Sequence, residues 1–188
     1  MNWQDMNWLN PPAAVAQEAG GLLVTTGENT DFWHGTYYGF HHHNGHFLHA
    51  PAQGDFSLET AFRAGFSAQY DQAGLMIRAD ESHWVKCGIE YVGGTAFLAV
   101  VVTNGMSDWS QLPMPDYAGQ LRLRLTRVGD AVWVQYLAGD AWRMLRLAYF
   151  PPELAVEAGV MCCSPSRAGL QVLFENVALT SPFSTKAY

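Results

Sequence analysis

The sequence predicts an all-β protein, a single antiparallel β-sandwich of jelly-roll kind over residues 1–188. Roughly eleven or twelve short apolar or alternating segments recur, with turn-forming residues every eight to twelve positions, which is the spacing of sandwiches and barrels. Little of the chain has the longer period of a helix. Because the 188 residues are 49% hydrophobic and contain no evident linker, one domain with a sizeable core is expected.

The N-terminal quarter is the least regular part of the chain. Pro, Gly and aromatic residues interrupt it often, so only short elements are expected. In order they are an extended lead-in (Asn2–Pro12), a helical turn (Ala13–Glu18), a short strand (Leu22–Thr26), an aromatic segment (Asp31–Tyr38) and a histidine-rich segment (Gly39–Ala50). Within the last of these, Asn44-Gly45 is a strong signal for a two-residue hairpin.

From Phe56 onward the alternation is clearer. In Leu121–Arg127, leucines alternate with arginine and threonine, as in a strand with one buried face. The expected strands are Phe56–Phe66, Gln72–Arg78, His83–Val92, Ala96–Thr103, Leu121–Arg127, Ala131–Leu137, Trp142–Ala148, Val156–Met161 and Leu170–Thr180. Between them, Asn104–Tyr117 is expected to be a long loop, and Cys162-Cys163 to end a buried strand.

The strand pair within Tyr70–Gly94 carries the candidate binding face. The side chains of its second strand alternate between two faces. One face is apolar and consists of Val85, Cys87, Ile89 and Tyr91. The other presents an indole, an ammonium and a carboxylate and consists of Trp84, Lys86, Gly88 and Glu90. Gln72, Met76 and Arg78 flank the polar face if the strands pair antiparallel. Since four residues along a strand span about 13 Å, Lys86 and Glu90 mark two points along a groove and are not a dyad.

An enzymatic role for Glu90 needs a partner from elsewhere in the chain. Glycoside hydrolysis normally uses two carboxyl groups about 5–9.5 Å apart. The positions two residues from Glu90 on its own strand are Gly88 and Val92, so a second carboxylate would come from Asp31, Asp71 or Asp108. A solvated surface position explains Glu90 equally well.

Six of the seven histidines lie between His34 and His49. If Asn44-Gly45 is the hairpin turn, His43 lies opposite His46 and His41 shares their face, so the three imidazoles could reach one metal ion. No carboxylate in this hairpin would orient such ligands, however. A polar hairpin tip is therefore the favoured interpretation, and no metal or other cofactor is expected.

Composition excludes several classes of partner. The chain has 10 Lys plus Arg against 17 Asp plus Glu, so it lacks the basic footprint that nucleic-acid binding needs. No apolar run approaches the roughly 20 residues of a membrane helix, and no membrane association is expected. The three cysteines do not form a disulfide framework and no signal peptide is visible, which favours the cytoplasm.

Four segments resemble the DUF1349 family. They are DFWHGTYYGFHHHNGHF from Asp31, YDQAGLMIRADESHWVKCGIEYVGG from Tyr70, SDWS from Ser107 and GVMCCSP from Gly159. The resemblance implies a concanavalin A-like lectin/glucanase sandwich with a concave face, where relatives of the fold bind or cleave glycans. Of the histidines, only His46 matches the family pattern. The Glu-x-Asp-x-x-Glu pattern of the β-glucanases is absent, so their mechanism does not transfer.

These observations predict a protein that binds a carbohydrate or other small polar ligand, such as a polyol, on an aromatic-lined concave face. The expected ligand-binding residues are Asp31, Trp33, Tyr38, His46, Gln72, Arg78, Lys86, Glu90, Asp108 and Trp109. One alternative is a glycoside-active enzyme with Glu90 as catalytic acid or base. Another, implied by a regulatory relative, is a protein-interaction domain of central carbon metabolism, whose protein partner would need a large exposed apolar patch.

Overall fold

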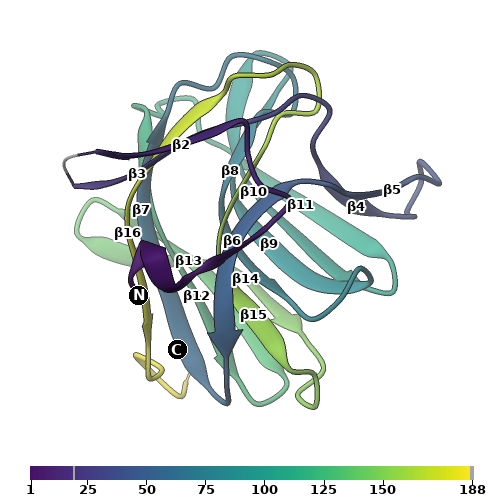
Figure 1. The fold of residues 1–188 in the computed structure, drawn as a ribbon. Coiled ribbons are helices and arrows are strands. Elements are labelled where there is room, and N and C mark those ends of the chain that lie inside the picture. The colour runs from purple at the N-terminus through teal and green to yellow at the C-terminus, as the bar shows by residue number, and fades with distance from the viewer. Residues whose placement is uncertain (19, 187–188) are drawn as a thin grey trace.

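The computed structural model describes residues 1–18 and 20–186, most of them in antiparallel strands (Figure 1). Within these residues, two seven-stranded sheets pack against each other. The first, sheet A, has the order β1 (Asn7–Leu9), β6 (His46–Ala52), β15 (Val156–Cys163), β8 (Gln72–Arg78), β9 (His83–Val92), β10 (Thr95–Asn104) and β11 (Ser107–Pro113). No helix among the described residues is long and apolar enough to cross a membrane.

The second sheet, sheet B, faces the first across the core. Its order is β14 (Ala141–Tyr149), β13 (Ala131–Ala138), β12 (Gln120–Val128), β7 (Phe56–Ala64), β16 (Gln171–Thr180), β3 (Gly21–Thr25) and β2 (Ala14–Glu18). A short 3-10 helix, η1 (Trp3–Asp5), precedes β1. The chain crosses repeatedly between the sheets, as from β6 to β7 and back to β8, which gives the predicted jelly-roll sandwich.

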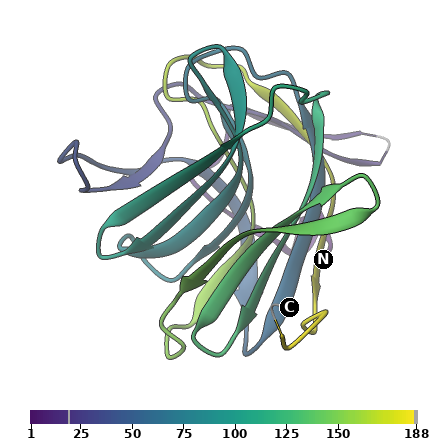
Figure 2. The ribbon, with the colours of Figure 1, turned by 180° about the vertical axis from the view of Figure 1, so that it is seen from behind.

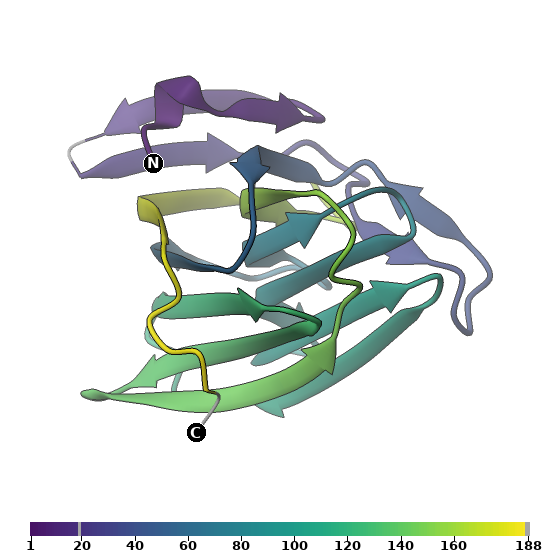
Figure 3. The same cartoon turned by 90° about the horizontal axis from the view of Figure 1, so that it is seen from below.

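A separate two-stranded sheet is made by β4 (Phe32–His34) and β5 (His41–His43). We call residues 31–43 the flap. It projects from one side of the sandwich in Figures 1 and 2 and lies at the right-hand edge of Figure 3. The flap covers part of the face of sheet A that points away from sheet B, and this position makes it a wall of the candidate site.

Sheet A is buried on both faces. Its inner face, with Val85, Cys87 and Ile89 of β9, belongs to the large core between the sheets. Its outer face carries a second, smaller core of aromatic and sulfur-containing side chains, formed by Phe32, Trp33, Phe47, Met76, Trp84, Val101, Met161 and Cys163. The predicted alternation along His83–Val92 is therefore confirmed, but its second face is only partly polar and is largely covered.

Two predictions about the elements were wrong. Ala13–Glu18, expected as a helical turn, forms the exposed edge strand β2, because pairing with β3 overrides its weak helical preference. The expected loop Asn104–Tyr117 contains β11, which pairs with β10 over Ser107–Pro113. Proline is tolerated there because β11 is an edge strand and Pro113 is its last residue.

The expected hairpin at Asn44-Gly45 is also wrong. β5 pairs with β4, so His41 lies opposite His34, and His43 does not face His46. Asn44 uses its side chain for contacts to the flap, accepting from the Asp31 N–H at 3.1 Å. A Cβ at Gly45 would lie only 2.3 Å from the Phe32 ring, so this glycine permits close packing and does not form a two-residue turn.

Candidate functional site

A pocket of about 310 Å³ opens between the flap and the outer face of sheet A. Strands β9, β10 and β11 provide its floor, while the flap and three loops provide its walls. The lining residues are Asn29, Asp31, Trp33, Tyr38, Phe40, His42, Tyr70, Lys86, Glu90, Val101, Trp109 and Pro165. Most of the lining is apolar, with a few charged and polar groups set into it, which is the usual make-up of a small-molecule site.

A buried ion pair lies at the inner end of the pocket. The Lys86 Nζ, which is almost wholly buried, donates to Asp31 Oδ1 at 3.1 Å and to the Phe32 carbonyl oxygen at 2.7 Å. The Gln72 side chain donates to the same Asp31 oxygen at 3.1 Å. Burial opposes the charge of the ammonium, but the Asp31 carboxylate, Cys163 and Glu90 favour it, and the pKa of Lys86 lies above its usual value.

Glu90 is the second charged group of the floor and is only 8% exposed. The Trp109 indole N–H donates to its Oε2 at 2.8 Å. Burial raises the pKa of Glu90 to about 6, against the opposing effect of Lys86, and the nearby Asp31 charge adds to the rise. Glu90 therefore exchanges its proton close to neutral pH, as a catalytic acid or a protonation-sensitive ligand would.

Aromatic side chains form the upper walls. Trp33 stands edge-on to Trp109, with ring centroids 6.4 Å apart, and edge-on to Tyr38 at 5.7 Å. Tyr38 stacks on Phe40 at 5.1 Å. The Trp33 indole N–H donates to the Thr36 carbonyl oxygen at 3.0 Å, which fixes the ring within the flap. These rings offer apolar faces next to the buried charges.

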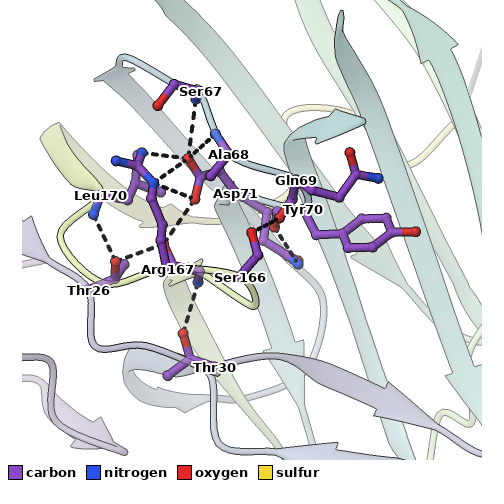
Figure 4. A network of polar contacts seen from close by, with 12 residues as sticks. Thr26, Thr30, Ser67, Ala68, Gln69, Tyr70, Asp71, Ser166, Arg167 and Leu170 are labelled. Carbon is purple, nitrogen blue, oxygen red and sulfur yellow. Dashed lines mark hydrogen bonds and ion pairs between the residues drawn. The ribbon is translucent and has the colours of Figure 1, made fainter. Parts of the chain in front are cut away.

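Asp71, a candidate second carboxylate, is a structural anchor outside the pocket (Figure 4). It is fully buried and accepts from the Arg167 Nε at 3.0 Å and from the backbone N–H groups of Ser67 and Ala68. Burial alone would raise its pKa, but these hydrogen bonds hold the pKa of Asp71 below its ordinary value. The anchor fixes the turn in which Tyr70 takes a left-handed conformation (φ 64°) beside the pocket.

The pocket brings together six of the ten predicted ligand-binding residues: Asp31, Trp33, Tyr38, Lys86, Glu90 and Trp109. Gln72 lies below them and binds Asp31. The remaining three lie outside it. His46 accepts from the Gly27 N–H at 3.0 Å and is hydrogen-bonded to the Asn10 carbonyl oxygen. Asp108 pairs with Arg146 at 3.1 Å. Arg78 is half-buried and lies opposite Trp84 in the strand register.

Six further lining residues were not among the predicted ones: Asn29, Phe40, His42, Tyr70, Val101 and Pro165. Strand register would have found Val101, because it lies directly between Lys86 and Trp109 in neighbouring strands. Asn29 and Pro165 lie between strands, and their approach depends on tertiary packing that no local pattern reveals.

The histidine cluster also differs from the expected set. His34, His41 and His43 place one ring nitrogen each within 4.8 Å of the others, whereas His46 is not part of the group. The change follows from the strand pairing, since His34 of β4 replaces His46 as the cross-strand neighbour of the β5 histidines.

Comparison with solved structures confirms the fold. The chain is similar to the GH43 protein BlXynB of Bacillus licheniformis, with a TM-score of 0.70 and 15% identity over 94% of this chain and 37% of that one. It is also similar to the CBM2 module of the evolved Dit of Lactobacillus casei BL23 phage J-1, with a TM-score of 0.63 and 12% identity over 98% and 92% of the two chains. The fold is an antiparallel jelly-roll β-sandwich.

Within this class, residues 8–182 match the model of the family described as "Protein of unknown function (DUF1349)", and the chain belongs to that family. It is 41% identical to "Regulation of enolase protein 1" of Saccharomyces cerevisiae over 176 residues, 93% of this chain and 89% of the yeast protein. A crystal structure of a functionally unknown yeast protein has a TM-score of 0.93 and 39% identity, covering 98% of this chain and all of its own.

Proposed function

We propose that this protein binds a carbohydrate or another small polyol in the pocket beneath the flap. The observation that carries the proposal is the combination of the buried Lys86–Asp31 pair and the buried Glu90 with flanking aromatic rings. Sugar hydroxyls bond well to charged groups that are already held in place, and the C–H faces of a sugar pack on aromatic rings. The volume of about 310 Å³ suits a ligand of one or two sugar rings.

A screen of glycans and sugar phosphates against the wild type and Glu90→Gln tests this proposal. The substitution keeps the size of the side chain and an acceptor for the Trp109 indole, but removes the charge. We expect it to weaken binding of a hit at least about tenfold, which corresponds to one lost charged hydrogen bond. The matched control is Asp108→Asn, since Asp108 pairs with Arg146 and does not line the pocket. Undiminished binding by Glu90→Gln would remove Glu90 from the site.

A glycoside-active enzyme is the second candidate, and the pKa of Glu90 favours it. A carboxyl group with a pKa of about 6 suits a general acid, and Asp31 supplies a second carboxylate in the same pocket. Turnover of aryl glycosides would be measured from pH 4 to 8. Glu90→Gln should abolish turnover while a bound sugar is retained. If the wild type binds a sugar but does not turn it over, the enzyme candidate is excluded and the binding function remains.

A regulatory, protein-interacting role is the third candidate. It is supported by the name of the yeast relative and by the exposed aromatic tip of the flap, where Tyr37 is 92% exposed and Tyr38 and Phe40 are more than a third exposed. The yeast name makes an enzyme of central carbon metabolism the partner to test first. Addition of this protein to purified enolase should alter enolase activity, and Tyr37→Ser should reduce the effect.

A further inference from the structure

The two faces of the flap have different chemistry. Side chains alternate along β4 and β5, and the register pairs His34 with His41 and Trp33 with His42. Trp33 and His42 share one face and line the pocket. His34, His41 and His43 share the other face, so they are not part of the sugar site and need an account of their own.

The spacing of these three imidazoles suits a metal ion. The Nδ1 atoms of His34 and His41 are 3.2 Å apart, and one ring nitrogen of each of the three residues lies within 4.8 Å of the others. With Zn–N bonds of about 2.0–2.1 Å, the nitrogens of a tetrahedral site are about 3.3 Å apart. The His34–His41 pair already has this separation, and a small rotation of the rings, of which only that of His41 is exposed, would bring in the third nitrogen.

His43 has the surroundings of a metal ligand. Its Nδ1 is buried and has no hydrogen-bond partner among the residues that the structure describes. Its Nε2 lies 3.7 Å from Glu81 Oε2, in the turn between β8 and β9. A carboxylate on the far nitrogen is the arrangement that fixes the tautomer and orientation of metal-binding histidines. This separation is longer than a hydrogen bond, so the exposed Glu81 side chain would have to move closer to His43 Nε2 to act as the orienting carboxylate that the histidine-rich segment lacks.

We propose that His34, His41 and His43 form a binding site for one divalent transition-metal ion, with Glu81 as the positioning residue for His43. Imidazole nitrogens suit zinc, copper, nickel and iron, and three of them leave a fourth position for water. Because His34 comes from β4 and the other two from β5, the ion would link the two strands of the flap and stiffen the wall of the pocket.

Isothermal titration of the tag-free, chelator-treated protein with Zn²⁺ tests the proposal. We expect one ion per chain and at least a tenfold loss of affinity in His34→Ala, His41→Ala or His43→Ala, because each removes a direct ligand. Glu81→Gln should lower the zinc affinity about tenfold, since the loss of an orienting carboxylate typically has an effect of this size. The matched control is His42→Ala, which lies in the same strand but on the pocket face and should change zinc affinity less than twofold.

A second measurement guards against misfolded variants. Each variant is unfolded thermally with chelator present, where it should match the chelator-treated wild type, and then with Zn²⁺. Zinc should raise the transition temperature of the wild type and His42→Ala, raise that of Glu81→Gln by less, and leave those of the three ligand variants nearly unchanged. Equal losses of affinity in His42→Ala and His41→Ala would overturn the proposal in favour of adventitious binding by a histidine tract. Absence of zinc binding by the wild type would also overturn it.

Discussion

Lys86 is a buried cation on a sheet face that is otherwise aromatic and apolar. Its charge is balanced mainly by Asp31, which lies just before β4, so the ion pair also joins the flap to the sheet. The Phe32 carbonyl oxygen, which also accepts from Nζ, strengthens this junction. One side chain therefore has two effects: it places a positive charge in the pocket and holds the pocket wall in position.

Replacing Lys86 by Met should be strongly destabilising. The change removes the cation but leaves the Asp31 carboxylate, which is 23% exposed, without its partner. We expect a loss of roughly 3–5 kcal/mol in the free energy of unfolding, at the lower end because Asp31 is partly hydrated. Urea denaturation measures this loss. The double variant Lys86→Met/Asp31→Asn should recover part of it. With Asp31→Asn measured alone, a loss in the double variant equal to the sum of the two single losses would show that the pair is not coupled.

Glu90 should make the protein less stable as the pH rises. An ordinary paired carboxylate has the opposite effect, because its stabilising contribution increases with pH. The pKa of Glu90 is about 6 in the folded protein against 4.5 as the ordinary value, so the folded state holds the proton more tightly. The protein therefore loses up to about 2 kcal/mol of stability as the pH rises from 4.5 through 6. Glu90→Gln should be more stable than the wild type at pH 8, and the difference should vanish near pH 4. A difference independent of pH would contradict the raised pKa.

At the scale of the strands, β8 and β9 carry a pair of directly opposed glycines. Gly74 and Gly88 are partners, and a Cβ at Gly88 would lie 2.0 Å from the Ala73 carbonyl oxygen. Gly88 lies on β9 midway between Lys86 and Glu90 and lines a small cavity that also contacts both of these residues. The absence of a side chain at Gly88 therefore bears on the spacing of the two charged groups.

Gly88→Ala should push β8 and β9 apart. Because the clash is with backbone and not with a flexible side chain, we expect a cost in the free energy of unfolding of about 3 kcal/mol, the upper end of the usual range for overpacking, and a marked fall in the thermal transition temperature. Ligand binding should weaken as well. The control is Gly65→Ala, where a Cβ would meet nothing within 4 Å. Similar transition temperatures for the two variants would contradict this account.

The strands that could be predicted from the sequence are those whose side chains alternate. The predicted limits of β8 and β9 are the observed ones, because both strands are central and their burial pattern is strong. The edge strands β2 and β11 were not predicted because most of their residues are exposed. Their sequences therefore lack the alternation of apolar and polar residues that identifies a strand with one buried face. The hairpin predicted at Asn44-Gly45 is absent for a different reason: the local turn preference is overridden by hydrogen bonds of the Asn44 side chain, which accepts from the Asp31 N–H and donates to the Asn29 carbonyl oxygen.

At the scale of the whole molecule, Asp71 and Arg167 tie together segments that are far apart in the sequence (Figure 4). Ser164 Oγ donates to the same Asp71 carboxylate and is bonded in turn to Thr26, so the network joins β15, β8 and the end of β3. Since these strands belong to both sheets, the network closes one end of the sandwich.

Asp71→Asn should therefore weaken the whole fold, by roughly 1.5–3 kcal/mol at neutral pH. The folded pKa of Asp71 is lowered, so its stabilising effect is complete above about pH 4, the unfolded pKa, and is lost as the pH falls further. The difference in stability between the wild type and the variant should consequently be largest near pH 6 and should shrink steadily as the pH falls below about 4 toward the lowered folded pKa. Denaturation curves at several pH values measure this convergence; a constant difference would argue against an ionised Asp71.

The candidate site was predictable only in part. Strand alternation identified Lys86 and Glu90, and the family resemblance added Asp31, Trp33 and Trp109. Nothing in the sequence indicated that Asp31 would pair with Lys86, because a contact across 55 residues depends on how the flap folds back. For the same reason the sequence did not show that His46 and Asp108 would lie outside the pocket. The His46 side chain is hydrogen-bonded to the Asn10 carbonyl oxygen, and Asp108 pairs with Arg146.

The second core on the outer face of sheet A has a consequence for how the molecule opens. The flap is attached to this smaller core and to the Lys86–Asp31 pair, while the strands beneath it belong to both cores. Hydrogen exchange should therefore show two levels of protection, with the amides of β4 and β5 exchanging through a local opening and those of β8 and β9 only through global unfolding. A ligand could then enter and leave by a fluctuation of the flap, while the sandwich remains intact.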